Sequence, residues 1–297
     1  VLFAVGEIVK VEAMHKTTDI YGPIPYTRFG LETPVPYDSQ EAVYMRFFAE
    51  LNHAVGVLTN FDRFNPNAKP LDKFDLIYGS DLKKWIRFAN SLKLRLAMRC
   101  RAVYDGAQKL AEEAVNNPYG VLEDNVDNAV MQTVGALSFT YNNPFYNIYS
   151  PEGYNEDRMG ATMDAYLNGF ADPRLPKFFA KAKGDVYRGL RNGMRNGKDF
   201  QGDERLSMPT ITRSTPYVWM TAAEVWLLRA EGALFGWNMG GTPEELYAQG
   251  VTTSFEQYGL ADAAEAYLTS TAKPSAYPGL GTSTAAEAPS DITPAWD

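Results

Sequence analysis

The residue types that most often carry enzyme chemistry are sparse in this chain and form no known catalytic pattern. The 297 residues include two histidines, His15 and His53, and one cysteine, Cys100. Neither histidine belongs to a zinc-ligating spacing, and Cys100 lies in an apolar and basic stretch rather than a protease-like sequence. The sequence has no nucleophile elbow, P-loop or dinucleotide-binding glycine pattern. We therefore expect no enzyme activity, no metal site and no cofactor.

The carboxylates leave one hydrolytic alternative open. Asp and Glu together account for 36 residues, so a helical protein of this composition places pairs of acids close together by chance. A glycan hydrolase needs two carboxylates roughly 5 to 10 Å apart in a cleft. Sequence spacing identifies no such pair, and a structure would distinguish paired acids from a surface of exposed rings.

Aromatic and amide side chains are the second group with chemical potential. The chain contains 18 tyrosines and 16 phenylalanines, and such rings suit a surface that stacks on sugars or peptides. Helical periodicity is lost from Val121 to Tyr154, and a second irregular stretch spans Gly184 to Ser214. The rings of the first stretch are Phe139, Tyr141, Phe145, Tyr146, Tyr149 and Tyr154.

Amphipathic helices predict the scaffold around these stretches. Apolar residues recur at helical spacing behind several helix-start signals, and short links between the helices indicate helical hairpins. We expect an all-α, mainly helical fold of tetratricopeptide-like hairpins with long irregular loops, including a tail from Thr271 to Asp297. The start signals are Asp38 with Glu41, Ser80, Thr221 with Glu224, and Thr242 with Glu245.

The helix predicted to begin at Ser80 carries a basic face. The formal net charge of the chain is -8 and its pI is about 5.0, so a nucleic-acid partner is disfavoured. We expect the basic face to be solvated and paired with acidic neighbours. No apolar run approaches the roughly 18 residues that a membrane span needs. The basic residues are Lys83, Lys84, Arg87, Lys93, Arg95, Arg99 and Arg101.

Several longer blocks of sequence point to a family. In chain order they are Thr18–Tyr26, Pro36–Glu41, Asp75–Asp81, Lys84–Arg99, and Met220–Leu234 followed by Gly236 and Trp237. Together they closely resemble the SusD/RagB family of outer-membrane nutrient-binding lipoproteins, in its SusD-like branch. The resemblance runs in order from about residue 5 to about residue 260.

The resemblance implies a binding protein rather than an enzyme. Proteins of this kind are lipid-anchored at the outer membrane and exposed at the cell surface, where they capture oligosaccharides, or in some members peptides. They deliver these nutrients to a SusC-like TonB-dependent transporter. A helical scaffold without a small-molecule ligand is the remaining alternative. Because the chain begins inside a helical pattern and ends in a tail, we expect a single SusD-like domain over residues 1–297, truncated at both ends and lacking its lipid anchor.

The two irregular stretches are the expected ligand-facing parts. Sugar capture needs flat rings for the apolar sugar faces and polar groups for the hydroxyls. The candidate ring platforms are Tyr141, Tyr146, Tyr149 and Tyr154, and the candidate polar partners are Tyr187, Arg188, Arg191 and Asn192. The alternative is that such rings fill the core beneath a long loop, which is the role we expect for Phe139 and Phe145.

Overall fold

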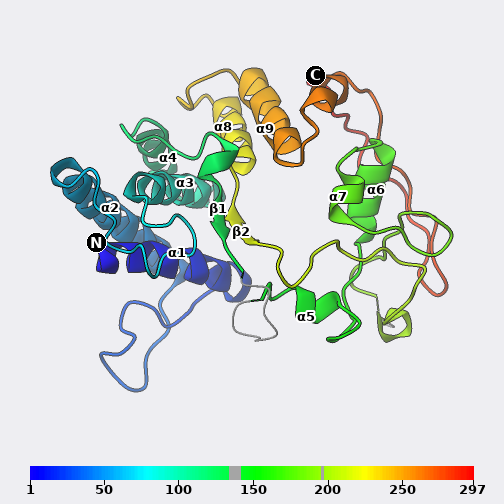
Figure 1. Ribbon diagram of the computed structural model, residues 1–297, viewed down its shortest axis with the longest axis horizontal. Helices are drawn as coiled ribbons and strands as arrows, with labels where there is room; N and C mark the ends of the chain where they lie inside the picture. The colour runs from blue at the N-terminus through cyan, green and yellow to red at the C-terminus, as the bar shows by residue number, and fades with distance from the viewer. Residues whose placement is uncertain (134–141, 195–196) are drawn as a thin grey trace. The chain divides into compact units, whose positions relative to one another are not determined.

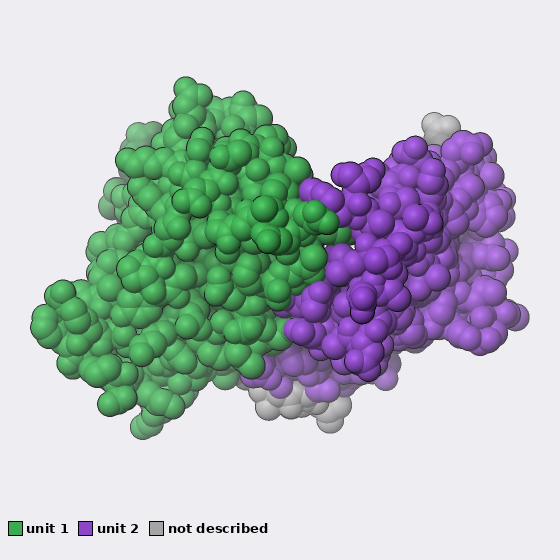
Figure 2. All heavy atoms as spheres, turned by 90° about the horizontal axis from the view of Figure 1, so that it is seen from above, with its two compact units in different colours: residues 1–131, 218–250 green, residues 132–217, 251–297 purple. Residues whose placement is uncertain are grey.

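The computed structural model of the chain describes residues 1–133, 142–194 and 197–297. They form two compact units, each made of two separate segments of the chain (Figure 2). Unit 1 contains residues 1–131 and 218–250, and unit 2 contains residues 132–217 and 251–297. The expectation that residues 1–297 form one domain stays a prediction.

Unit 1 is an array of helices with a small two-stranded sheet (Figure 1). Helix α1 packs on α2, α2 on α3 and α3 on both α4 and α8, which confirms the expected helical, tetratricopeptide-like architecture. The elements are α1 (Leu2–Tyr21), α2 (Gln40–Phe64), α3 (Leu82–Cys100), α4 (Ala107–Val115), η1 (Asn125–Asp127), β1 (Ala129–Met131), its partner strand β2 (Tyr217–Met220), α8 (Ala222–Leu234) and the first half of α9 (Pro243–Gln257).

Helix α3 is the central element of unit 1. Its apolar residues, among them Trp85, Phe88 and Leu92, are fully or almost fully buried because other helices cover it on several sides. The prediction of a solvated basic face is therefore wrong for Lys93 and Arg95, which are only 6% and 7% exposed. The expected pairing with acids is confirmed: Arg99 contacts Asp19 at 2.7 Å and Arg87 contacts Asp127 at 2.9 Å.

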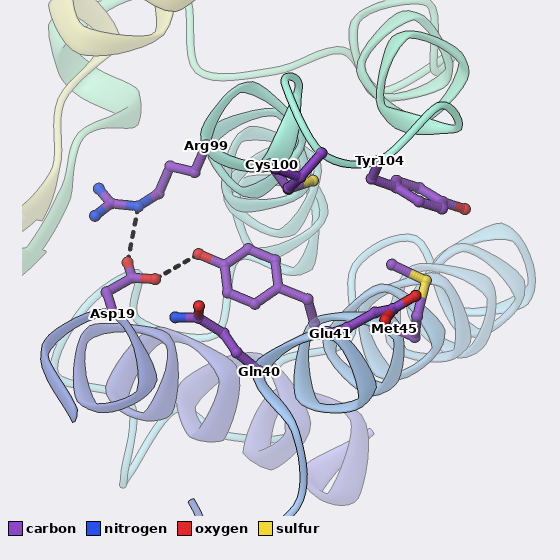
Figure 3. Close-up of a pocket in the computed structure, with 9 residues that line it drawn as sticks. Asp19, Gln40, Glu41, Met45, Arg99, Cys100 and Tyr104 are labelled. Carbon is purple, nitrogen blue, oxygen red and sulfur yellow. Dashed lines mark hydrogen bonds and ion pairs between the residues drawn. The ribbon is translucent and has the colours of Figure 1, made fainter. Parts of the chain in front are cut away.

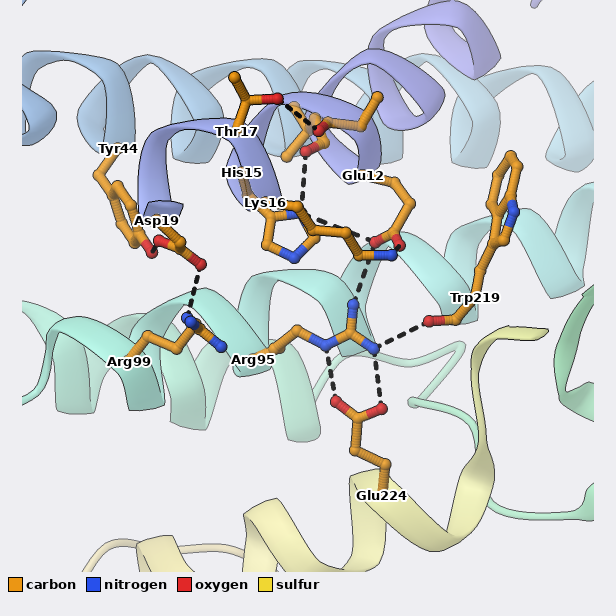
Figure 4. Close-up of polar contacts among 12 residues, drawn as sticks. Glu12, His15, Lys16, Thr17, Asp19, Tyr44, Arg95, Arg99, Trp219 and Glu224 are labelled. Atoms are coloured by element: carbon orange, nitrogen blue, oxygen red, sulfur yellow. Dashed lines mark hydrogen bonds and ion pairs between the residues drawn. The ribbon is translucent and has the colours of Figure 1, made fainter. Parts of the chain in front are cut away.

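The buried Arg95 guanidinium connects three helices (Figure 4). Its Nη1 donates to Glu12 of α1 at 3.1 Å, and its Nε and Nη2 donate to the Glu224 carboxylate of α8 at 2.6 and 2.8 Å. Nη2 also donates to the Trp219 carbonyl of β2 at 3.1 Å. Burial raises the pKa of Glu12, and the Arg95 charge opposes that rise. Residues more than 120 positions apart are thereby held in one polar network.

Two of the predicted helix starts are confirmed. The Thr221 hydroxyl accepts a hydrogen bond from the Glu224 backbone N–H at 3.1 Å at the start of α8. At the start of α9, Thr242 and Glu245 form a reciprocal capping box, with side chain to backbone distances of 3.0 and 3.3 Å. These caps satisfy backbone donors that a helix leaves unpaired in its first turn.

The other two predicted caps are wrong by one residue. Ser39, rather than Asp38, caps α2, because the Asp38 carboxylate instead accepts from the Tyr26 and Thr27 backbone of the preceding loop. Asp81, rather than Ser80, caps α3. Ser80 has a φ of 69°, which is unsuitable for an N-cap residue.

Unit 2 is less regular than unit 1. Its small apolar clusters centre on Met159, Leu167 and Leu175, and on Phe200, Leu206 and Leu280. The tail beyond residue 270 contains only isolated bridges, as expected. Across the described ranges, no helix is both long and apolar enough to span a bilayer. The elements are α5 (Tyr146–Tyr149), α6 (Ala161–Gly169), α7 (Leu175–Phe178), η3 (Gly197–Phe200), the second half of α9, η4 (Ala261–Ala263) and α10 (Ala264–Leu268).

Candidate functional site

Aromatic rings gather around α5 in unit 2, the short helix labelled in Figure 1. Phe145 is 45% exposed and Tyr154 is 67% exposed, while Tyr146 and Tyr217 are half-buried. The Phe145 and Tyr217 ring centroids lie 5.6 Å apart. We call Phe145, Tyr146, Tyr154 and Tyr217 the α5 surface.

A buried asparagine holds α5 in place. The Asn143 side chain accepts from the Phe145 backbone N–H at 3.0 Å and donates to the Thr215 carbonyl at 3.1 Å. The Asn143 backbone N–H donates to the Arg213 carbonyl at 3.0 Å. Because both ends of this side chain are used, the start of α5 is fixed against residues 213–215.

A glycine brings Tyr154 back to α5. At Gly153, a Cβ atom would lie 1.9 Å from the Asn147 carbonyl oxygen, so only glycine fits this approach. The next residue, Tyr154, donates its backbone N–H to the same oxygen at 2.9 Å. Its exposed ring therefore belongs to a loop that is pinned by its backbone.

An arginine covers one face of Tyr146. The Arg213 guanidinium lies 5.3 Å from the centroid of the Tyr146 ring and pairs with the Glu152 carboxylate. The hydrogen bond to Tyr146, followed by the Glu152 charge, raises the pKa of Arg213. The guanidinium over the ring and the carboxylate that pairs with it are both groups that can bind hydroxyls.

Tyr149 does not have the exposure of a stacking platform. It is only 5% exposed and meets Tyr146 edge-on, with centroids 5.9 Å apart. Burial, and secondarily the nearby Tyr146, raises the pKa of Tyr149 to about 12. Tyr149 is therefore a buried residue that packs beneath the exposed rings of the α5 surface. Phe145, which we expected in the core, is exposed. Two residues of the same stretch, Phe139 and Tyr141, lie outside the described residues.

The predicted polar partners lie on an extended segment beside α6. Gly160 and Leu190 form a parallel bridge, and a Cβ at Gly189 would lie 2.5 Å from the Gly160 oxygen. The Arg188 backbone exchanges hydrogen bonds with Ser207 at 2.9 and 3.1 Å. The half-buried Tyr187 ring packs against the cluster around Met159.

The end of this segment lines a cavity of about 240 Å³. Arg191 and Asn192 form part of its rim, and the Arg191 Nη1 atom donates to the Thr284 hydroxyl at 3.0 Å. We call this cavity the Arg191 pocket. Its lining residues are Ala161, Thr162, Ala165, Arg191, Asn192, Tyr277, Ala286, Glu287 and Pro289.

Unit 1 contains a larger pocket, of about 410 Å³, between α1, α2 and the end of α3 (Figure 3). Asp19 accepts from the Tyr44 hydroxyl at 2.5 Å and from the Arg99 Nε at 2.7 Å. Asp19 and Arg99 are therefore engaged with each other, whereas Glu41 also lines this pocket. Burial raises the pKa of the Cys100 thiol at the same pocket, which keeps it in the unreactive thiol form.

The predicted site residues thus fall into two groups. Tyr146, Tyr149 and Tyr154 meet at α5, and Arg191 and Asn192 meet at the Arg191 pocket. Among the described residues, no hydrogen bond, ion pair or ring contact joins the two groups, and no cluster of three or more His, Cys, Asp or Glu side chains could hold a metal ion. Sequence reasoning missed Arg213, Tyr217 and Glu287, which lie far from their partners in the chain and belong to no motif.

Comparison with known proteins identifies the family. The family model described as SusD-like, "Susd and RagB outer membrane lipoprotein", matches residues 1–297. The chain therefore belongs to the SusD-like family of outer membrane lipoproteins, as its sequence blocks indicated. SusD-like proteins are binding proteins, so family membership confirms the prediction that the chain is not an enzyme.

Solved structures agree with this assignment. A chitin-binding SusD homologue from Flavobacterium johnsoniae is 38% identical with a TM-score of 0.88, and the match covers 99% of this chain and 61% of that one. A SusD homologue from Bacteroides thetaiotaomicron is 39% identical with a TM-score of 0.86, covering 99% and 60% of the two chains. A SusD-like protein from the same organism is 32% identical with a TM-score of 0.89, covering 100% and 62%. The chain thus spans about three fifths of the length of these structures. No curated protein matches it.

Proposed function

We propose that this chain is part of a cell-surface nutrient-binding protein that captures oligosaccharides and delivers them to a SusC-like TonB-dependent transporter. The observation that carries the proposal is the likeness to the chitin-binding homologue over 99% of the chain, at 38% identity. The family description as outer membrane lipoproteins supports the location and the lipid anchor. Exposure at the cell surface and the transporter partner belong to the proposal.

The α5 surface supplies the ring platform of this function. Its exposed rings offer flat apolar faces, and the Arg213–Glu152 pair offers a donor and an acceptor beside them. We retain Tyr146 and Tyr154 as proposed platforms and add Tyr217. Arg191 and Asn192 are the proposed polar partners at the second surface, with Tyr187 and Arg188 on the segment that leads to it.

The direct test is isothermal titration calorimetry of the purified protein against plant, host and microbial oligosaccharides, including chitin fragments, together with a peptide mixture. We expect one glycan class to bind. The double variant Tyr146→Ala/Tyr154→Ala should weaken that binding at least tenfold, which corresponds to about 1.4 kcal/mol.

The matched control is Tyr21→Ala, because Tyr21 is also strongly exposed but lies in unit 1. This variant should bind as the unchanged protein does. If only peptides bind, the peptide-binding alternative replaces the oligosaccharide proposal. If no glycan and no peptide binds, the scaffold alternative is favoured and nutrient capture is refuted.

A further inference from the structure

The Arg191 pocket differs chemically from the α5 surface. Among the described residues that line it, the one aromatic side chain is Tyr277, which is buried and donates its hydroxyl to Ser283, so these residues present no aromatic face for a sugar to stack on. At about 240 Å³, it is smaller than the roughly 300–1,000 Å³ typical of drug-sized ligands. The pocket therefore suits one sugar unit and its substituent rather than a long glycan chain.

The apolar lining consists of small side chains. Ala161 and Ala165 are four residues apart on α6 and so share one face of the helix. Ala286 also lines the pocket, and its backbone exchanges hydrogen bonds with Tyr277 at 2.8 and 2.9 Å. Because each of these alanine side chains is a single methyl group on a hydrogen-bonded backbone, the pocket has room for a methyl group of a ligand.

The polar lining residues include Arg191, Asn192 and Glu287, and most of their donors and acceptors have no partner among the described residues. Arg191 uses its Nη1 for Thr284. Within the described part of the chain, no hydrogen bond or ion pair engages the side chains of Asn192 or Glu287. The positive charge of Arg191 and the negative charge of Glu287 cancel, so the pocket has no net formal charge. This favours a neutral ligand over an anion or a cation.

We propose that the Arg191 pocket binds the acetamido group of an N-acetylhexosamine unit. The acetamido methyl packs against Ala161 and Ala165. Its carbonyl accepts from Arg191 or the Asn192 amide, and its N–H donates to the Asn192 oxygen or to Glu287. A planar amide with a small methyl matches this lining, whereas a hydroxyl in its place would leave the apolar part of the pocket empty.

This inference rests on the proposed glycan-binding function, and matched ligands separate the two. Chitotetraose and cellotetraose have the same β-1,4-linked backbone and differ in an acetamido group or a hydroxyl at carbon 2. By calorimetry we expect chitotetraose to bind at least tenfold more tightly. The tetramer of glucosamine, which carries an ammonium group there, should bind as weakly as cellotetraose or more weakly.

Two variants test the pocket itself. Asn192→Ala removes an exposed amide, and Ala161→Leu fills the methyl space with a good helix former. Both should bring the chitotetraose-to-cellotetraose affinity ratio close to one, because each should weaken the binding of chitotetraose more than that of cellotetraose. The control Ala266→Leu, at an exposed position of α10, should leave the ratio unchanged.

The outcomes are distinct. Equal affinity for the two tetramers, preference for a glycan without acetamido groups, or a ratio that survives both variants would overturn the acetamido assignment and leave glycan capture standing. Failure to bind any glycan of the wider panel would remove the proposed function and this inference together.

Discussion

Replacing Arg95 with methionine should destabilise unit 1 more than any surface substitution. The change removes one of the partners of Glu12, whose side chain is only 4% exposed, and the partner of Glu224, whose side chain is 39% exposed. Breaking a buried ion pair from one side costs about 3–5 kcal/mol. Lys16 still contacts Glu12 at 2.6 Å, and solvent screens Glu224, so we expect about 3 kcal/mol. At about 2–4 °C per kcal/mol, that lowers the Tm by about 6–12 °C.

The assay is urea denaturation of wild type, Arg95→Met, and the double variant Glu12→Gln/Arg95→Met. The double variant should recover more than half of the lost unfolding free energy, because it removes the buried carboxylate that the single variant leaves without Arg95.

The pH dependence supplies a second test. Burial raises the pKa of Glu12, and loss of Arg95 raises it further. A carboxyl group with a raised folded-state pKa contributes stability at low pH that is lost as pH rises through that pKa. The destabilisation by Arg95→Met should therefore be larger at pH 7.5 than at pH 5. A double variant as unstable as the single one, or a single variant costing under about 1 kcal/mol, would refute the reasoning.

Three further predictions concern unit 1. Thr221→Ala should cost about 1 kcal/mol of unfolding free energy through loss of the α8 cap, whereas Thr221→Ser keeps the hydroxyl and should cost less, as measured by urea denaturation. Burial and then the Arg95 charge lower the pKa of His15 to about 4, so stability present above about pH 6.5 should decline as pH falls towards 4; NMR titration would contradict this if His15 protonated near pH 6.5. Cys100 is buried with a raised pKa, so an aromatic disulfide reagent should label it at least tenfold more slowly in native than in denatured protein.

The helical scaffold was predictable from the sequence because local signals specify it. The Thr221 and Thr242 caps depend on residues within one turn, and both are present. The displaced caps have a tertiary cause, since Asp38 is recruited by the backbone of another loop. The burial of Arg95 could not be predicted from local sequence either, because its acidic partners lie 83 and 129 residues away in the chain.

The ligand surfaces were predictable as regions but not as sets of atoms. The loss of helical periodicity and the gathering of rings identified the stretch that forms α5. Whether a ring is a platform or a support depends on what lies beneath it, so Tyr149 and Phe145 exchanged their expected roles. Arg213 contacts Tyr146 although the two residues are 67 positions apart, and no local sequence pattern predicts such a contact.

The Arg191 pocket differs from the buried polar networks of unit 1 in how its polar groups are used. In unit 1, the guanidinium of Arg95 is bound by two carboxylates and a carbonyl, and Asp19 is held by Tyr44 and Arg99. Satisfied groups of this kind rigidify a scaffold, and a ligand would have to break their bonds to bind them. In unit 2, Asn192 and Glu287 line a cavity without internal partners among the described residues. A ligand can bind there without breaking an existing side-chain bond of Asn192 or Glu287, which supports the proposal that glycans are recognised in unit 2.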